Sequence, residues 1–271
     1  MSAQYTSYVN HNIVIWGTGG QSALSSGLTG MQSLWDTGYG IGAGYEFQYK
    51  KLSILTGVEY TQLKTSLAYD KFSIDVDNLY DDEGDRFMGH YTFSDNLDTY
   101  SLGNINIPLE FGIRSKKFYA LAGVKLGFNI LATSHTASSV AFSGTYENYL
   151  GTFENMPNHS FGSFTATGDF IPVLAMNCSA TAEAGVNLGK KANYRLGAFI
   201  DYGFLNINGN ALQSPVLYGT GNMPYLNDFM MGTAMPTTLM YGGLKLTILL
   251  KLNEKPDCNC DTYSNTKKKR K

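Results

Sequence analysis

The sequence predicts an all-β protein: an eight-stranded antiparallel transmembrane β-barrel of the outer-membrane type with three long extracellular loops. Three observations support this prediction. Apolar and polar residues alternate with period two in segments of about ten to fourteen residues, the length that a tilted strand needs to cross a bilayer. Short turns alternate with long connections along the chain. Charged residues make up 15% of the 271 residues and aromatic residues 13%, whereas about 25% of a soluble domain is charged.

The same composition argues against other classes of protein. No run of apolar residues is long enough for a transmembrane helix, which needs about 20 of them. The net charge of −2 gives no electrostatic case for a nucleic-acid partner. A hydrophobic content of 43% argues against a disordered chain.

The predicted strands follow in order along the chain. The first, within residues 11–24, is the least regular. The second, residues 39–49, is the clearest, because every odd position is apolar or aromatic and every even position is Gly or polar. The other six show the same alternation, within residues 52–61, 104–114, 118–130, 176–188, 195–204 and 243–250.

The connections predict how these strands are arranged. Three are tight, at residues 50–51, 114–117 and 189–193, and one of moderate length spans residues 26–36. Three are long, at residues 67–99, 133–169 and 209–235. In outer-membrane barrels the short turns are periplasmic and the long loops extracellular. We therefore expect a periplasmic segment at residues 1–10, a barrel at residues 11–252 and a basic periplasmic tail at residues 253–271.

A soluble barrel with an apolar cavity would show the same alternation. The lumen of an eight-stranded barrel is only just wide enough for side chains. The bulky aromatic and aliphatic face is therefore expected to point outward into lipid, while Gly, Asn, Ser and single charges point inward. Several aromatic residues also fall toward the strand ends, as an interfacial girdle requires: Tyr39, Tyr45, Tyr49, Phe118, Tyr194, Tyr202 and Phe204.

The inward face would carry a network of five acids and four bases. We expect these side chains to pair and to fill the lumen, because unpaired charges there would be costly. A proton or ion path, or a catalytic carboxylate pair, is the alternative, but nearly balanced charge leaves little field for selecting ions. The nine residues are Glu46, Glu59, Glu110, Arg114, Lys125, Glu183, Arg195, Asp201 and Lys245.

No catalytic, metal or cofactor site is predicted. The neighbours Ser134 and His135, like His159 and Ser160, lie in predicted loops without a matching carboxylate, and adjacency alone makes no triad. The acidic segment 70–98 fails the spacing of an EF-hand calcium loop. Cys258 and Cys260 could supply two metal ligands, but partners are missing nearby.

The basic end of the chain has two interpretations. A terminal basic run is usually a solvated end. It could also dock an acidic partner or an anionic envelope surface. The residues concerned are Lys267, Lys268, Lys269, Arg270 and Lys271.

Three segments carry a resemblance to a known family, at residues 38–45 (GYGIGAGY), 107–112 (IPLEFG) and 119–127 (YALAGVKLG). With them the chain resembles the small OmpA-like barrels of the outer membrane, in particular those of the Bacteroidota type. The resemblance implies a closed barrel without a channel, cofactor or catalytic residues. Members of this group include accessory parts of type IX secretion and outer-membrane assembly machinery. In contrast to the OmpA protein itself, we expect no peptidoglycan-binding domain after the barrel in this sequence.

From the residues and the resemblance together, we expect a non-enzymatic outer-membrane protein of a Gram-negative bacterium. Its expected role is that of an accessory or scaffold subunit of an envelope protein complex. The expected partners are outer-membrane lipid and other envelope proteins, which would bind the wall, the loops or the tail. No nucleic-acid partner is expected. A narrow pore or transporter is one alternative, and an outer-membrane lipid-modifying or proteolytic enzyme is another.

Overall fold

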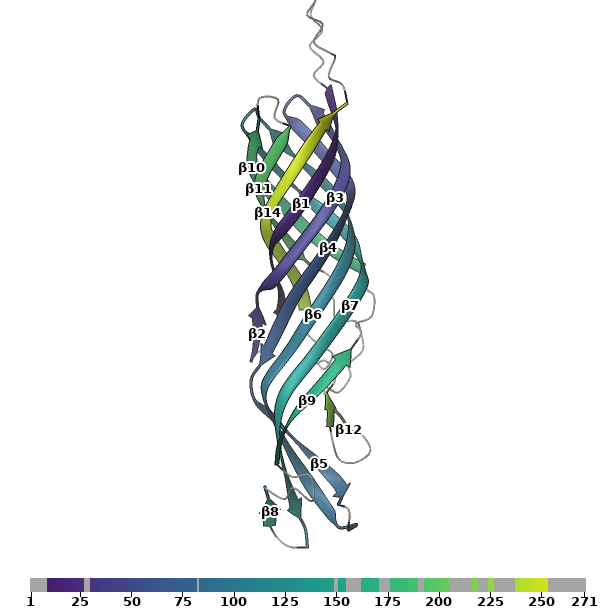
Figure 1. Cartoon of the computed structure of the whole chain (residues 1–271), viewed down its shortest axis with the longest axis vertical. Helices are drawn as coiled ribbons and strands as arrows, with labels where there is room; N and C mark the ends of the chain where they lie inside the picture. Colours follow the sequence, from purple (N-terminus) through teal and green to yellow (C-terminus); the bar gives the residue numbers. More distant parts are fainter. Residues whose placement is uncertain are drawn as a thin grey trace, which may run out of the picture.

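The fold is a closed barrel of eight antiparallel strands that continues at one end into a narrower β-sheet (Figure 1). The computed structural model describes residues 9–26, 30–81, 83–148, 151–154, 162–170, 176–189, 193–204, 216–218, 224–226 and 237–252. Within these residues no helix is long and apolar enough to cross a membrane.

The eight barrel strands correspond to the eight predicted segments. Each pairs antiparallel with its neighbour in the order β1–β3–β4–β6–β7–β10–β11–β14, and β14 pairs with β1 to close the ring. Closure leaves these strands without a free edge within the ring. The predicted fold class is therefore confirmed. The strands are β1 (Val9–Ser26), β3 (Asp36–Tyr49), β4 (Leu52–Tyr69), β6 (Arg86–Arg114), β7 (Phe118–Tyr146), β10 (Met176–Leu188), β11 (Tyr194–Gly203) and β14 (Thr237–Lys251).

Near the tight turns the barrel carries an apolar belt on its outer surface. On β7 the outward residues from Phe118 to Ile130 are all exposed and all Ala or larger apolar residues. On β6 the exposed apolar residues run from Ile105 to Ile113. The distance from Phe118 to Ile130, at about 3.3 Å per residue and a tilt near 45°, spans about 28 Å across the wall. This height matches the apolar band of an outer-membrane barrel, which is about 25 Å.

Beyond the belt the outer face of the wall becomes more polar, and large apolar side chains are found on its inner face. On β4, Lys64 is exposed while Leu63 is buried, and on β6, Ser101 faces outward while Tyr100 and Leu102 are buried. The outer surface thus becomes more polar, while the interior loses the ion pairs and contains a larger apolar cluster. The apolar interior of this part consists of Leu24, Leu63, Leu67, Tyr100, Leu102, Ala132, Phe199, Leu239 and Tyr241.

A β-bulge lies at the same level as this change. Gly103 pairs with Leu131 but Asn104 pairs with Asn129, so Ile130 is an extra residue on β7. Ile130 and Leu131 are consecutive and both exposed. The bulge therefore moves the outward face of β7 from even to odd residue numbers.

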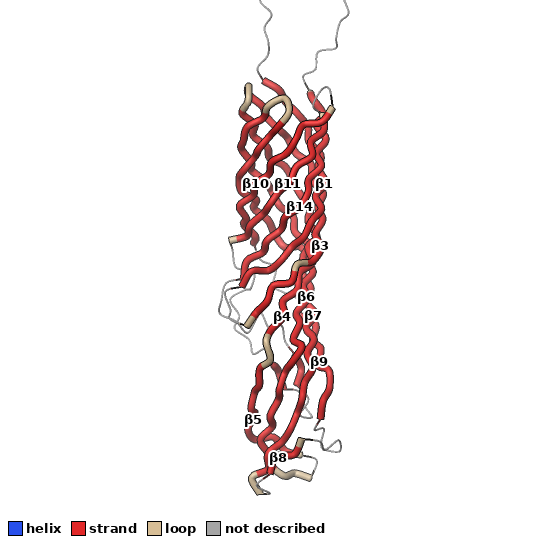
Figure 2. Tube along the Cα trace, turned by 90° about the vertical axis from the view of Figure 1, so that its left-hand side faces the viewer, coloured by secondary structure: helices blue, strands red, loops and turns tan. Residues whose placement is uncertain are grey.

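The end of the molecule opposite the tight turns forms an open antiparallel sheet, here called the extension. It comprises β5 (Phe72–Tyr80), β8 (Gly151–Phe153), β9 (Gly162–Phe170) and the far parts of β6 and β7, residues 86–96 and 134–146 (Figure 2). β5 begins opposite Phe93, three residues beyond the end of the β4–β6 pairing, so it continues the line of β4 along β6. The extension has its own core of Phe87, Tyr91, Phe93, Val140, Phe142, Tyr146 and Ala166.

Two of the three predicted long loops are thus largely strand, and this corrects the sequence analysis. Residues 67–99 and 133–169 lie opposite the tight turns as predicted, but they build β5, β8, β9 and the far parts of β6 and β7. Their alternation is real: Phe72, Ile74 and Val76 pack on the extension core, with Ser73 and Asp75 exposed between them. The sequence analysis missed this pattern because the outward residues are often acidic and because the strands are longer than a bilayer requires.

The remaining connections are short strands or tight turns. Residues 26–36 contain β2 (Met31–Leu34), which pairs with β4. The third long connection is described only where β12 (Val216–Tyr218) pairs with β13 (Pro224–Leu226). The start of β1 and the end of β14 lie together at the tight-turn end, where the Leu252 amide donates to the His11 carbonyl (2.8 Å; Figure 1).

Candidate functional site

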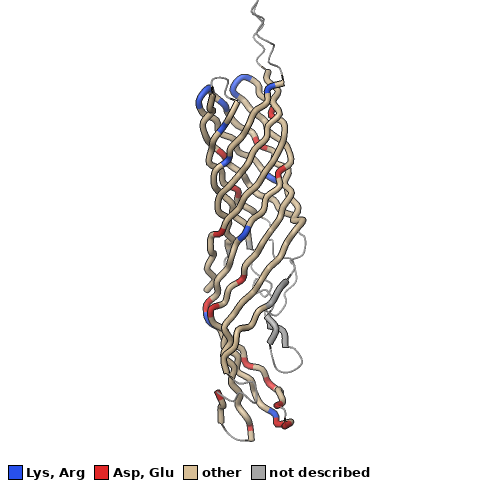
Figure 3. The backbone as a smooth tube through the Cα atoms, viewed as in Figure 1, with Lys and Arg blue, Asp and Glu red and all other residues tan. Residues whose placement is uncertain are grey.

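The interior of the barrel behind the apolar belt holds the ionisable residues that the sequence singled out. All nine residues are buried there, with at most 8% of each residue exposed. Acidic and basic residues are spread along the barrel between its ends (Figure 3). Period-two alternation places them inside, because successive residues of a strand point to opposite faces. Their ion pairs fall into three clusters, each further from the tight turns than the one before.

The cluster nearest the tight turns is centred on Glu46. Arg195 donates to both carboxylate oxygens of Glu46 through Nη2, at 2.6 and 2.8 Å. The Arg114 Nη1 atom lies 3.8 Å from Glu46 Oε2. Asn12 and Ser53 also donate to this carboxylate. With two bases to one acid, the cluster is formally positive.

The second cluster is centred on Lys245. Its ammonium group donates to Glu183 and lies 3.9 Å from Glu110 Oε1. It also lies over the Trp16 ring, 5.1 Å from the centroid, which adds a cation–π contact. With two acids to one base, this cluster is formally negative.

The third cluster is centred on Lys125, which bridges β4 and β11. Its Nζ donates to Glu59 Oε2 at 2.8 Å and to Asp201 Oδ2 at 2.7 Å. The Trp16 indole N–H donates to the other oxygen of Glu59 at 3.0 Å. Trp16 therefore joins the second and third clusters into one packed column.

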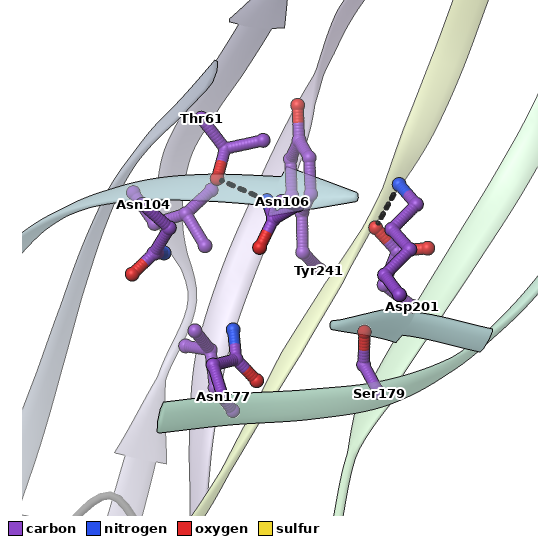
Figure 4. A pocket seen from close by; sticks show the side chains of 10 residues that line it. Thr61, Asn104, Asn106, Asn177, Ser179, Asp201 and Tyr241 are labelled. Carbon is purple, nitrogen blue, oxygen red and sulfur yellow. Dashed lines mark hydrogen bonds and ion pairs between the residues drawn. The ribbon is translucent and has the colours of Figure 1, made fainter. Parts of the chain in front are cut away.

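A small cavity borders the third cluster (Figure 4). Its volume is about 20 Å³, and Asn104, Asn106, Asp201 and Tyr241 are among its lining residues. A water molecule needs about 10–15 Å³ on this measure, so the space suits about one water. Both amide atoms of Asn104, which lines the cavity, have no protein partner. The cavity thus suits a bridging water rather than an organic ligand.

The arrangement makes a filled and rigid barrel lumen. Buried charges are stable only when paired and hydrogen-bonded, and each of the nine has an opposite charge within 4 Å. Tyr119 and Arg195 add bulk through a further cation–π contact of 5.0 Å. Five acids and four bases nearly cancel, so the filled lumen carries little net charge for selecting ions of one sign.

Comparison with protein-family models finds no match, and comparison with curated proteins finds none either. Among solved structures, two crystal structures of Ail, the attachment invasion locus protein of Yersinia pestis, align with the chain. One is a complex with the heparin analogue sucrose octasulfate; it is 10% identical, covers 89% of this chain and 99% of Ail, and has a TM-score of 0.28. The other is 12% identical, covers 89% and 98%, and has a TM-score of 0.30.

The chain is a barrel of the outer-membrane type. At these TM-scores the likeness to Ail adds nothing to that statement, which rests on the closed ring of eight strands and on the apolar belt around it.

The structure also brings together a group that the sequence analysis missed, on the outward face of the extension. Asp75 Oδ1 lies 2.7 Å from His90 Nδ1, and His90 Nε2 lies 2.8 Å from Thr145 Oγ1. Thr145 in turn contacts Thr152 at 2.8 Å. Only the strand register could have revealed this group, because the residues come from β5, β6, β7 and β8.

The order carboxylate, imidazole, hydroxyl matches that of a hydrolase triad, but the surroundings do not. The side chain of Asp75 is 65% exposed and that of His90 30%. Thr145 is the penultimate residue of β7 and is paired with Met88 on one side and Thr152 on the other. Catalysis of this kind needs hydrogen-bond donors, such as backbone amides, that point at a developing oxyanion. The backbone amides of paired strands instead donate to the neighbouring strands of the sheet. The group is best explained as a cross-strand polar ladder.

The other residues considered for chemistry are separated or lie outside the described residues. His135 is on β7, not in a loop, and it is exposed while Ser134 is buried on the opposite face. His159, Ser160, Cys258, Cys260 and Lys267–Lys271 lie outside the described residues. Among the described residues, no group of three or more His, Cys, Asp or Glu could hold a metal ion.

Proposed function

We propose that this chain is a non-enzymatic outer-membrane protein that serves as a scaffold or accessory subunit of an envelope protein complex. The observation that carries the proposal is the combination of a lumen filled by ion pairs with an extension that has its own core. The barrel then acts as the anchor in lipid, and the extension acts as the surface that a partner protein binds.

The filled lumen favours an anchor over a pore or transporter. The three clusters and Trp16 occupy the barrel behind the apolar belt, and the cavity beside them has room for about one water. A steady path for hydrated ions through the lumen would require these ion pairs to separate. Breaking a buried pair costs several kcal/mol.

The structure of the extension favours a role in presenting a binding surface to other proteins. β6 and β7 run without interruption from the tight turns to the far end, 29 residues each. The aromatic core, in which Tyr91 and Phe142 stack at 4.2 Å, holds this part as a sheet. Its outward face is built from small polar residues, among them Ser73, Thr92 and Ser143. A stiff surface of this kind costs a partner little ordering entropy on binding.

The orientation and family belong to this proposal. We propose that the tight turns lie on the periplasmic side, together with both ends of the chain, and that the extension lies outside the cell, as is usual for the long connections of outer-membrane barrels. The resemblance to OmpA-like barrels of the Bacteroidota type rests on the three sequence motifs. It makes type IX secretion and outer-membrane assembly machinery the first complexes to test.

Single-channel recording tests the anchor part of the proposal. Purified protein in a planar bilayer should show no steady conductance, and neither should a Gln62→Arg control on the outer wall. Persistent, uniform channels in the wild type would contradict a filled lumen and would favour the pore.

Quantitative co-purification after cross-linking in the native host tests the scaffold part. A Thr92→Arg/Ser143→Arg variant alters the outward face of the extension, and a Thr133→Arg variant changes the exposed barrel wall instead. We expect the same partner proteins with the wild type and the control, and a clear loss with the double variant. Equal recovery in all three would remove the extension from the proposal. The basic tail is tested in the same assay by deleting residues 256–271.

A further inference from the structure

Two adjoining hollows lie at the tight-turn end of the barrel, and their chemistry is complementary. The first is a cavity of about 480 Å³ whose lining includes five basic residues and no acidic one: Lys50, Lys51, Arg114, Lys116 and Lys251. The second is a groove of about 290 Å³ lined mainly by apolar residues, among them Ile113, Phe118 and Ala120. Lys51, Arg114 and Ser115 line both.

The groove lies on the surface that faces lipid. Ile113 is 62% exposed and Phe118 63% exposed, and both belong to the apolar belt. Ile113 pairs with Ala120 across β6 and β7, so the small Ala120 forms the floor between two large side chains. The groove therefore lies at the rim and opens onto the outer wall.

The basic cavity is formed by turns and strand ends that come together only in the barrel. Lys50 and Lys51 connect β3 to β4, Lys116 lies between β6 and β7, and Lys251 ends β14. Lysine and arginine gather at this end in Figure 3, whereas the far tip of the extension is mainly acidic. Lys50 has a φ of 55°. Gly or Asn would adopt this left-handed conformation with less strain, so a lysine is present here at a cost to the backbone.

We propose that the cavity and the groove together bind one anionic phospholipid of the leaflet at the tight-turn end. The phosphate headgroup lies among the lysines and Arg114, and an acyl chain follows the groove along Ile113, Phe118 and Ala120. A hollow of about 300–1,000 Å³ is typical for small ligands, so the basic cavity has room for a glycerophosphate headgroup. A free anion would use only the cavity, whereas a lipid uses both hollows.

Native mass spectrometry of the full chain in a neutral detergent tests this proposal. The probes are palmitoyl-oleoyl phosphatidylglycerol and the phosphatidylcholine with the same acyl chains. We expect one phosphatidylglycerol to be retained in clear preference to phosphatidylcholine. The Lys51→Gln/Lys116→Gln variant should weaken retention about 25-fold, because each basic residue at an anionic lipid surface contributes about fivefold.

Two further variants separate the parts of the site. Lys64→Gln/Lys71→Gln removes the same charge far from the tight turns and should leave retention unchanged. Ala120→Trp fills the groove without altering charge and should lower retention of phosphatidylglycerol. Heat-modifiable migration on a denaturing gel verifies that each variant is folded.

Three results would overturn the proposal. The first is equal retention of the two lipids by the wild type. The second is an equal loss in the two lysine double variants. The third is displacement of phosphatidylglycerol by millimolar inorganic phosphate together with no effect of Ala120→Trp, which would identify a site for free anions.

Discussion

Trp16 shows how single residues shape the barrel lumen. Its indole lies where a Cβ on Gly42 would approach ring carbons to 2.3 and 2.4 Å, and its N–H donates to Glu59. The glycine of β3 therefore provides the space that the ring fills. Gly42 and Trp16 thus connect the ion pairs of the lumen to the strands of the barrel wall.

We expect Gly42→Val to destabilise the barrel by about 2 kcal/mol, because added atoms in a packed interior force neighbours out of their rotamers. Urea unfolding in detergent micelles, followed by Trp fluorescence, measures the change. Ala43→Val is the matched control, since Ala43 is the next residue and points outward. An equally large effect of Ala43→Val would mean that the loss does not come from the contact with Trp16.

The Arg195 Nη2 atom donates to both carboxylate oxygens of Glu46, at 2.6 and 2.8 Å. We expect Arg195→Ala to cost about 4 kcal/mol, because it leaves a buried carboxylate without its main partner. The triple variant Glu46→Gln/Arg114→Gln/Arg195→Gln should be less destabilised than Arg195→Ala, since it removes all three charges of the cluster and so buries no unpaired charge. The same urea assay measures the wild type and both variants, and a triple variant at least as unstable as Arg195→Ala would refute this account.

At the scale of elements, the extension has a core separate from that of the barrel. Tyr91 and Phe142 stack with ring centroids 4.2 Å apart and an angle of 10°. Neither belongs to the apolar clusters inside the barrel. Local stability in proteins follows such separate packing units.

We therefore expect Phe142→Ala to weaken the extension by about 3 kcal/mol and to leave the barrel folded. Limited proteolysis should cut within residues 72–96 or 134–153 far faster than in the wild type, while a barrel fragment still shows heat-modifiable migration. Ala141→Ser, at the outward neighbouring position, is the control. Loss of the folded barrel band in Phe142→Ala would show that the two parts unfold together.

The tip of the extension is held by Asp81. Its Oδ1 accepts the backbone amides of Glu83 and Asp85 at 3.1 and 2.8 Å, and its Oδ2 accepts the Tyr146 hydroxyl at 2.9 Å. Burial, together with this hydrogen bond, raises the pKa of Tyr146 above its ordinary value of 10.0. The folded state thus keeps the phenol protonated where the unfolded chain loses the proton.

The stability of the extension should therefore be constant with respect to Tyr146 below about pH 10 and should fall as the pH rises further. The thermal unfolding midpoint of the extension, followed by circular dichroism between pH 8 and pH 11, measures this decline. Tyr146→Phe should show a smaller decline because it has no proton to lose. An identical decline in both proteins would assign the effect to other groups.

At the scale of the whole molecule, the change of polarity along the wall marks the edge of the lipid. Within the belt the outside is apolar and the inside holds the ion pairs beside a smaller apolar cluster; beyond it the outside is more polar and the inside contains a larger apolar cluster together with buried polar residues such as Asp98. Each part keeps charges paired or hydrated and apolar groups away from water. The surroundings of the outer wall therefore decide which face of each strand is apolar.

This boundary predicts a cost that depends on depth. We expect Leu109→Arg, in the middle of the belt on β6, to destabilise the barrel by about 3 kcal/mol in lipid, and Ile113→Arg, at its rim, by less than about 1 kcal/mol. Reversible folding into vesicles under denaturant measures both. Equal costs at the two positions would place the bilayer elsewhere on the wall.

The sequence by itself determined the class of fold and the composition of the lumen. Alternation within residues 39–49, 104–114 and 118–130 is local, and it fixes which side chains share a face before any strand has found its partner. That is why the eight strands and the inward position of residues such as Glu46, Lys125 and Arg195 were predictable.

Only the tertiary structure decided which groups meet and where the strands end. The pairing of Lys125 with Glu59 and Asp201, and of Asp75 with His90, depends on register between strands that are distant in sequence. The bulge at Ile130 reverses a face with no clear sequence signal, and the strands of the extension are held by packing around Tyr91 and Phe142 rather than by local preference. The pairing of β4 with β6 also placed Lys51 and Lys116 at the same part of the rim, next to the apolar groove. Such contacts are long-range, and period-two alternation carries no information about strand offset.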